Sequence, residues 1–545
     1  MIGPRFLLHV LALVASVELL KGDKPNIIII LADDMGYSDI GCYGSEIETP
    51  HLDRLSRDGV RFTQFYNAAR CCPSRASILT GLYPHQAGMG EMTLDFGVPA
   101  YRGKILNHAT TIAEVLSGGG YETFMVGKWH LGEDREVWPD RYGFDRYYSF
   151  LQGASNYFNL KPWNSGGQAM RIVEAGRDIE AGSGFYMTDA FTDKAVEFIE
   201  ERNSDQPFFM YLAYTAPHWP LHALPEDIAK YKGRYLEGWD EIRKNRFARM
   251  QEMGIIRKDF ELPSRNREVG PWSSVEEADR EEWDTKMAIY AAMIDRMDQG
   301  IGLVLEALEG QGALERTVIF FLADNGGCHE ELPWGSITAP LDGEPGSENT
   351  FMSYDRPWAN VSNTPFDWYK SYNHEGGIAT PLVAFGPCIV DADTKGSIES
   401  KRLGHIVDLL PTCLDLAELR YPVRIGEREI TPTPGRSLMP SLKGREENPH
   451  EALYWEHMTS RAIRSGDWKL VANGKAEWVE GEPIWELYHL KDDPFERRNL
   501  AGNYPERVMA MTKQYNDWAE ETGVLAPLEF FELRKVAKDN LNAAH

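Results

Sequence analysis

The chain has 545 residues, 43% of them hydrophobic, and its 57 basic against 83 acidic residues give a net charge of −26. This composition supports a sizeable folded core and excludes a natively disordered chain. The acidic balance argues against a nucleic-acid-binding protein, which needs basic surfaces, but it leaves room for an anionic substrate in a locally basic pocket.

The N-terminal segment is typical of a secretory signal. One positive charge lies within residues 1–5, and residues 6–17 are almost wholly apolar. Such a run is too short to span a bilayer but fits the apolar region of a signal peptide. We therefore predict a signal at residues 1–22, an exported protein that is periplasmic or secreted, and no membrane insertion of the mature chain. The alternative is a buried N-terminal strand.

Four apolar runs indicate strands buried on both faces, and each leads into polar residues. The runs are 26–32, 121–126, 207–213 and 318–323; they precede Asp33-Asp34, Lys128-Trp129-His130, Pro217-His218 and Asp324-Asn325. Helical patterns lie between them, most clearly at 285–308. The alternation predicts an α/β fold with a largely parallel central sheet, and ligands bind at the carboxyl edge of such sheets.

The C-terminal part has a different pattern. Residues 430–435 are typical of a connector, and short strand-like segments follow near 453–455, 468–471 and 485–488, before a helical pattern at 504–521. We predict a catalytic domain over residues 23–425 and a smaller α+β domain over 426–545. The highly charged residues 226–285 suggest a solvated helical insertion.

A helix is expected to begin close to Cys71. Pro73 suits its first turn and Gly81 its end. Cys71 would then lie at a helix N-terminus, where negative charge is favoured, and Arg75 would share its face. The structural alternative is two buried cysteines in front of a helix.

The run Cys71-x-Pro73-Ser74-Arg75-x-x-x-x-Thr80-Gly81 resembles the signature of the type I, formylglycine-dependent sulfatases. Nearly the whole chain shares this resemblance, which is strongest to bacterial arylsulfatases. Further matching segments are Asp33-Asp34, Gly127–His130, Pro217-His218, Asp324-Asn325-Gly326 and Lys370 before Glu375-Gly376-Gly377. The resemblance implies an alkaline-phosphatase-like core and a smaller C-terminal domain with an antiparallel sheet.

The resemblance also implies a cofactor pair. Cys71 would be oxidised to Cα-formylglycine by a maturation enzyme, and a divalent cation would be bound by Asp33, Asp34, Asp324, Asn325 and the modified residue 71. The oxygen ligands suit Ca²⁺, with Mg²⁺ as the alternative, better than zinc. Taken singly, each acidic pair could equally be a turn at a strand end.

In the mechanism that the resemblance implies, one hydroxyl of the hydrated aldehyde attacks sulfur and the other, on losing a proton, releases sulfate. Lys128 would polarise sulfate oxygens, Arg75 would orient the hydrated aldehyde, and His130 would assist the release step. His218 and Lys370 would hold the ester oxygen, with His218 as a proton donor to the leaving alcohol, and Asp324 would accept the proton of the attacking hydroxyl. An isolated histidine near a strand end is more often structural.

The predicted function is hydrolysis of a sulfate monoester of a small molecule or saccharide. Two alternatives remain open at this point: a phosphomonoester or phosphonate ester hydrolase on the same scaffold, and a non-catalytic carbohydrate-binding relative. His85, His374 and the aromatic residues Trp358, Phe366 and Trp368 are weaker candidates for the pocket wall and could instead be structural.

Overall fold

The computed structural model describes residues 24–162, 170–332, 343–445, 450–474, 478–479 and 482–544. The predicted signal at residues 1–22 lies outside this part of the chain. No helix among the described residues combines the length and the apolar character needed to cross a bilayer.

The centre of the molecule is a sheet of ten strands. In spatial order these are β11 (Ile398–Glu399), β2 (Val60–Phe62), β10 (Leu382–Phe385), β9 (Thr317–Ala323), β1 (Asn26–Ala32), β8 (Phe208–Ala213), β4 (Glu122–Lys128), β5 (Arg146–Phe150), β6 (Ile172–Glu174) and β7 (Arg177–Ile179). Strands β9, β1, β8, β4 and β5 run parallel, whereas β10 and β6 run antiparallel to their neighbours. The four predicted strands and the largely parallel sheet are confirmed.

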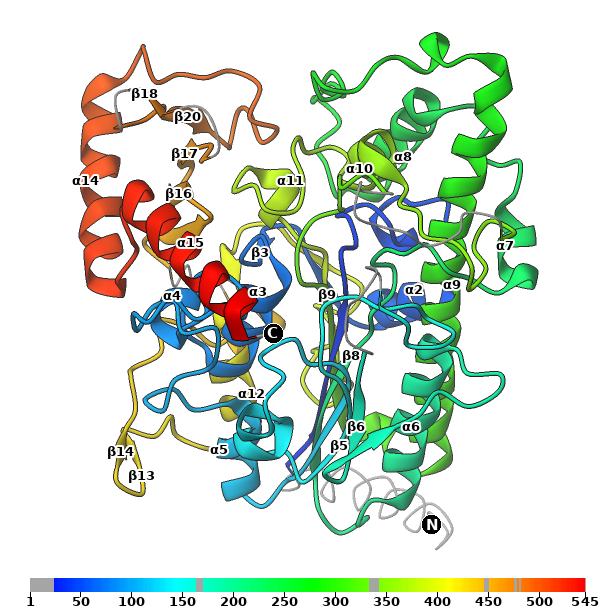
Figure 1. Ribbon diagram of the computed structural model, residues 1–545, viewed down its shortest axis with the longest axis vertical. Coiled ribbons are helices and arrows are strands. Elements are labelled where there is room, and N and C mark those ends of the chain that lie inside the picture. The colour runs from blue at the N-terminus through cyan, green and yellow to red at the C-terminus, as the bar shows by residue number, and fades with distance from the viewer. Residues whose placement is uncertain are drawn as a thin grey trace, which may run out of the picture.

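Helices cover both faces of this sheet (Figure 1). In β1, Ile28 and Ile30 belong to one apolar cluster, together with residues of α2 (Pro50–Asp58), α6 (Met187–Glu201) and α9 (Arg280–Gly310). Ile27 and Ile29 belong to another, with residues of α3 (Cys71–Thr80), α5 (Ile112–Gly118) and α12 (Leu409–Leu416). Because alternate residues of a strand point to opposite faces, a run of apolar residues is what two covered faces require. Further helices that the structure describes before the C-terminal sheet are α4 (Pro84–Ala87), α7 (Pro225–Tyr231), α8 (Trp239–Met253), α10 (Asp355–Ser362), α11 (Glu375–Ile378) and α13 (Met439–Leu442).

A second, antiparallel sheet lies in the C-terminal part. It consists of β15 (Leu453–His457), β16 (Ser460–Ser465), β17 (Trp468–Ala472) and β20 (Glu486–His489), and it packs against α14 (Pro505–Thr522). The C-terminal antiparallel sheet is thereby confirmed, although β16 and α15 (Pro527–Ala544) were not predicted. Two-stranded pairs join β12 (Gly404–His405) to β3 (Phe65–Tyr66), β13 (Arg424–Ile425) to β14 (Arg428–Glu429), and β18 (Trp478–Val479) to β19 (Glu482–Pro483).

The solvated helical insertion expected at residues 226–285 is confirmed only in part, because many of its residues are exposed but one face of α8 (Trp239–Met253) is buried. Trp239 at the start of α8 is buried and packs edge-on against Trp272 and Trp358. Arg246 of the same helix is fully buried and forms ion pairs with Asp39 and Glu46. Most charged side chains of this segment are exposed, as expected, but a few of them, such as Arg246, are paired inside the molecule.

Candidate active site

Four oxygen-bearing side chains converge where β1 and β9 end. The two strands pair in register up to Ala32 and Ala323, so the residues that follow leave the same edge of the sheet. The Asp34 amide donates to Asp324 Oδ1 at 3.2 Å, and Asn325 Nδ2 donates to Asp34 Oδ1 at 2.7 Å. Asp33, Asp34, Asp324 and Asn325 are all buried.

Two of these buried oxygens accept no hydrogen bond: Asp33 Oδ1 and Asn325 Oδ1. A buried polar atom without a partner is costly, and it commonly marks a place for an ion or a water molecule. The donor set is made of carboxylate and amide oxygens, which suits Ca²⁺ or Mg²⁺. The four residues therefore fit the cation that the sequence led us to expect.

Three buried cations neutralise the three carboxylates. Lys128 Nζ lies 2.6 Å from Asp33 Oδ2, and Lys370 Nζ lies 2.7 Å from Asp34 Oδ2. Arg75 donates to Asp324 Oδ2 through Nη2 at 2.8 Å and Nε at 3.1 Å. Since each carboxylate already has a positive partner, an added divalent cation would leave a positively charged pocket, which favours an anionic substrate.

At Asp34, burial and the neighbouring groups shift the pKa of the carboxyl in opposite directions. Burial alone would raise the pKa of this carboxyl, but its interactions with His218 and with the ammonium group of Lys370 together outweigh burial and lower it below its ordinary value. Asp34 is therefore ionised at neutral pH, as a cation ligand must be.

Cys71 is the first residue of α3 and is buried. Arg70 precedes the helix in an extended conformation, and Gly81 ends it with a φ of 66°, in the left-handed region that favours glycine. A hydrogen bond from Cys72 holds the pKa of the Cys71 thiol well below its ordinary value, and the nearby Lys128 and His130 act in the same direction against burial. Cys71 is also close enough to Asp34 to affect the pKa of that carboxyl. The helix start predicted from sequence is confirmed.

The two histidines reach the site from different strands. His130 follows β4, and its ring lies over Gly153, where a Cβ would come within 2.5 Å of His130 Cε1. His218, after β8, places Nε2 3.3 Å from both Asp34 Oδ2 and Lys370 Nζ, while Nδ1 lies 2.6 Å from the carbonyl oxygen of Trp219. Burial lowers the pKa of His218 to about 3. His218 is thus neutral at pH 7, with its proton on Nδ1.

The weaker candidates have structural partners. His85 Nε2 lies 2.7 Å from Glu456 Oε2, and His374 Nε2 lies 2.9 Å from Glu486 Oε2. Trp358 is fully buried in α10, Phe366 packs against Tyr37, and Trp368 packs against Tyr372 and His374. These aromatic residues anchor their loop, in line with the structural alternative.

One group of residues beside Cys71 was missed. Arg70 Nη1 lies 3.3 Å from Glu330 Oε1 and 2.7 Å from Ser371 Oγ, and Trp219 Nε1 donates to Glu330 Oε2 at 2.9 Å. Arg70 and Glu330 are about one-fifth exposed, at 21% and 19% for their side chains. A charged residue directly before the helix was the signal available in the sequence; its partner, 260 positions away, had none.

Comparison with known proteins agrees with this geometry. A model of the family described as Sulfatase matches residues 25–419. The chain is 33% identical to an uncharacterised sulfatase of Schizosaccharomyces pombe, over 96% of this chain and 99% of that protein. It is 34% identical to an arylsulfatase of Klebsiella aerogenes, over 76% of this chain and 91% of that one.

Solved structures show the same fold. Ps i-CgsB, solved in complex with k-i-k-neocarrahexaose, covers 93% of this chain, with 94% of its own length, at 25% identity and a TM-score of 0.65. The family match spans most of the chain, and the Schizosaccharomyces pombe relative aligns with nearly all of it. The chain therefore belongs to the sulfatase family and is a sulfuric ester hydrolase.

Proposed function

We propose that the chain hydrolyses a sulfate monoester by using a formylglycine, formed from Cys71, as the nucleophile beside a divalent cation. The observation that carries this proposal is the position of Cys71: it begins α3 next to Lys128 and within electrostatic reach of Asp34. The cation would be Ca²⁺, with Mg²⁺ as the alternative, held by Asp33, Asp34, Asp324, Asn325 and residue 71. We further propose that a formylglycine-generating enzyme matures the chain and that the protein is exported.

The residues around Cys71 support these roles for the cation and the aldehyde. When bound, the cation supplies positive charge to the sulfate oxygens, and the hydrated aldehyde supplies a hydroxyl nucleophile together with a second hydroxyl for sulfate release. Lys128 is close enough to Cys71 to lower the pKa of its thiol and, if a cation shares Asp33, could donate to a sulfate oxygen. Arg75 is held by Asp324 and by the carbonyl oxygen of Lys128 at 2.7 Å, so its role is to position these groups.

His218 and Lys370 together would protonate the oxygen of the leaving alcohol. In neutral His218, Nδ1–H donates to the carbonyl oxygen of Trp219, so Nε2 is an acceptor. The ammonium group of Lys370 is the donor in this pair. We therefore assign delivery of the proton to Lys370, with His218 orienting it, in place of the direct donation from His218 expected from sequence. His130, beside Cys71, is placed to take up a proton during sulfate release, and burial keeps its pKa low enough for it to start neutral.

The substrate class is a sulfated small molecule or saccharide. Among the relatives, one is named arylsulfatase, and an N-acetylglucosamine-6-O-sulfatase of Bacteroides thetaiotaomicron is 27% identical over 88% of this chain. A screen of sulfate release from aryl sulfates, steroid sulfates and sulfated saccharides distinguishes these substrates.

The test is a comparison of Cys71→Ala with Cys388→Ala, which changes an exposed cysteine. We expect Cys71→Ala to abolish sulfate release and to keep the wild-type melting temperature within a few degrees, and Cys388→Ala to retain full activity. Rates on an aryl sulfate and the matching aryl phosphate separate a sulfatase from a phosphatase. Near-wild-type turnover by Cys71→Ala, or a faster reaction with the phosphate ester, would refute the proposal.

A further inference from the structure

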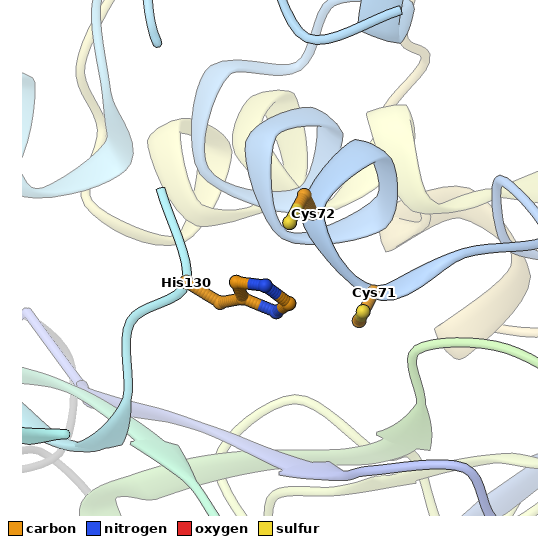
Figure 2. Close-up of side chains that lie close together, drawn as sticks. All are labelled: Cys71, Cys72 and His130. Carbon is orange, nitrogen blue, oxygen red and sulfur yellow. The ribbon is translucent and has the colours of Figure 1, made fainter. Parts of the chain in front are cut away.

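Cys72 is a buried thiol that the proposed mechanism does not use. It is the second residue of α3 and is fully buried. Its Sγ, the Sγ of Cys71 and a ring nitrogen of His130 all lie within 4.8 Å of one another. Figure 2 shows the ring of His130 facing the side chains of both cysteines. Two sulfurs and an imidazole nitrogen therefore lie close together. They are next to the oxygen cluster, which is formed by Asp33, Asp34, Asp324 and Asn325.

The spacing of these atoms suits a tetrahedral metal ion. In such a site, with Zn–S of about 2.3 Å and Zn–N of about 2.0 Å, neighbouring ligand atoms lie about 3.5–3.8 Å apart. The three atoms, within 4.8 Å of one another, need to approach by about 1.3 Å at most to reach that geometry. Two Cys and one His with an open fourth position form a known type of zinc site, and soft sulfur ligands disfavour Ca²⁺ and Mg²⁺.

We propose that the chain with an unmodified Cys71 binds one soft divalent cation, such as Zn²⁺ or Cd²⁺, through the sulfurs of Cys71 and Cys72 and a ring nitrogen of His130. The site exists only before residue 71 is oxidised, because an aldehyde at this position removes one of the two sulfur ligands. A bound soft cation would also occupy the thiolate of Cys71. This inference concerns the unmodified chain and does not depend on the catalytic role of formylglycine.

The local charges are compatible with such an ion. As a metal ligand, the thiol of Cys71 gives up its proton to solvent. Burial raises the pKa of Cys72, so this thiol must release its proton to solvent when the metal binds. Two thiolates cancel the two charges of the cation. The positive charge of Lys128, which would oppose binding, is paired with Asp33.

A second group, made of Asp33, Asp34 and His218, also meets the spacing for a metal among the described residues, and the experiment must separate it from the thiol site. Its ligands include no sulfur. Absorbance from thiolate-to-Cd²⁺ charge transfer therefore reports the proposed site alone, and an excess of Ca²⁺ keeps the oxygen ligands occupied.

The test uses the full chain produced without a maturation enzyme, with the intact mass confirming an unoxidised Cys71. Titration with Cd²⁺ in excess Ca²⁺ should give a charge-transfer band that saturates at one equivalent. Cys72→Ser should reduce the band by about half and weaken binding by more than tenfold, since even the loss of an outer-shell partner costs about 10–100-fold. His130→Gln should weaken binding to a similar extent and keep the two-thiolate band. This variant tests the proposal independently if Cys72→Ser fails to fold.

Two controls complete the design. Cys388→Ser removes an exposed thiol, and His218→Ala removes a ligand of the oxygen-rich group; both should leave the band and its stoichiometry unchanged. The proposal is overturned if wild-type chain gives no band, if Cys72→Ser and His130→Gln both bind like wild type, or if Cys388→Ser abolishes the signal. Because no catalysis is measured, a chain that binds Cd²⁺ but never acquires an aldehyde would refute the proposed function and leave this inference standing.

Discussion

Arg75 connects the helix that carries Cys71 to the oxygen cluster. Its guanidinium makes two hydrogen bonds to Asp324 Oδ2 and one to the carbonyl oxygen of Lys128. These contacts need the fork of donors that arginine provides and lysine lacks. Arg75 was expected from sequence to orient the hydrated aldehyde; its contacts show that it holds Asp324, which we propose as a cation ligand, in place.

We predict that Arg75→Lys weakens Ca²⁺ binding by about 10–100-fold, the usual cost of losing a group that orients a ligand. The single ammonium group cannot replace three hydrogen bonds in this fixed arrangement. Isothermal titration with Ca²⁺ measures the change, and Arg102→Lys, at a partly exposed ion pair, is the control. Unchanged Ca²⁺ affinity in Arg75→Lys would show that Asp324 does not need this partner.

At this scale the sequence predicted most of the candidate site. The acidic pairs, Cys71, Lys128 and the histidines stand at strand or helix ends, where polar residues after apolar runs are conspicuous. The pairing of Arg70 with Glu330 could not be predicted, because it depends on how two distant loops meet. The proton on Nδ1 of His218 was equally inaccessible, since it is set by the carbonyl oxygen of Trp219.

Helix α11 supports the loop that follows β9. The amide of Gly326 donates to the carbonyl oxygen of Gly377 at 3.1 Å, and a Cβ at Gly326 would lie 1.8 Å from the carbonyl oxygen of Gly376. This close backbone approach requires glycine, because neither chain segment can yield by rotating a side chain. The contact fixes the loop directly after Asp324 and Asn325.

Gly326→Ala should therefore displace α11 or the loop and lower kcat/KM by about 100-fold, the cost of a misplacement of about 1 Å. The control is Gly118→Ala at the end of α5, where an added Cβ meets nothing within 4 Å. Steady-state kinetics on an aryl sulfate, with circular dichroism to confirm folding, test this expectation. A folded Gly326→Ala enzyme with wild-type kinetics would mean that the close approach is irrelevant to the site.

Elements with strong local patterns were predictable, and those stabilised by distant contacts were not. The apolar runs of β1 and β9 and the long helix α9 have unambiguous patterns. Strand β16 has the sequence Ser-Arg-Ala-Ile-Arg-Ser, which is too polar to stand out, and it forms because β15 and β17 flank it. One face of the charged helix α8 is buried, because Trp239 and Arg246 contact partners elsewhere in the fold.

Buried charges join the C-terminal sheet to the catalytic core. Lys469 of β17 lies 2.8 Å from both Glu375 at the start of α11 and Glu496. His374 and Glu486 form a second pair across the same boundary. The sheet thus contacts the residue that begins α11, which in turn supports the loop after β9. The predicted boundary at residue 425 stays a prediction, but these contacts tie both parts of the chain together.

The stability that the pair of His374 and Glu486 contributes at this boundary should depend on pH. Burial alone would lower the pKa of His374, but its hydrogen bond to Glu486 together with the charges of Glu496 and Glu486 outweighs burial and raises the pKa above its ordinary value. A raised histidine pKa gives stability that is complete below the unfolded value of about 6.5 and is lost as the pH rises through the folded value. The melting temperature of wild type should therefore exceed that of His374→Gln most at about pH 6 and by progressively less at alkaline pH.

Thermal melts of both proteins between pH 6 and 9 measure this difference. His108→Gln is the control, because that exposed ring faces a backbone carbonyl and has no carboxylate partner. A gap between wild type and His374→Gln that stays constant or widens with pH would show that His374 is not protonated in the folded protein.

The fold class of the whole molecule could be predicted because it follows from the order of buried strands and helices. How the C-terminal sheet docks could not, since the sequence shows Lys469, His374, Glu486 and Glu496 only as isolated charges. These charges find their partners only when the C-terminal sheet and the catalytic core are in contact. The same holds for the active site, whose opposite charges come from segments up to 336 residues apart.

The chemical state of residue 71 tests the central claim most directly. Trypsin should release the short peptide Cys71–Arg75 from active, purified enzyme, and mass spectrometry with an aldehyde-reactive label reports its side chains. We predict an aldehyde at residue 71 in a fraction of molecules that matches the fraction of active sites, with the thiol of Cys72 intact. Fully active enzyme that carries an unmodified thiol at residue 71, or an aldehyde at residue 72 instead, would contradict this account.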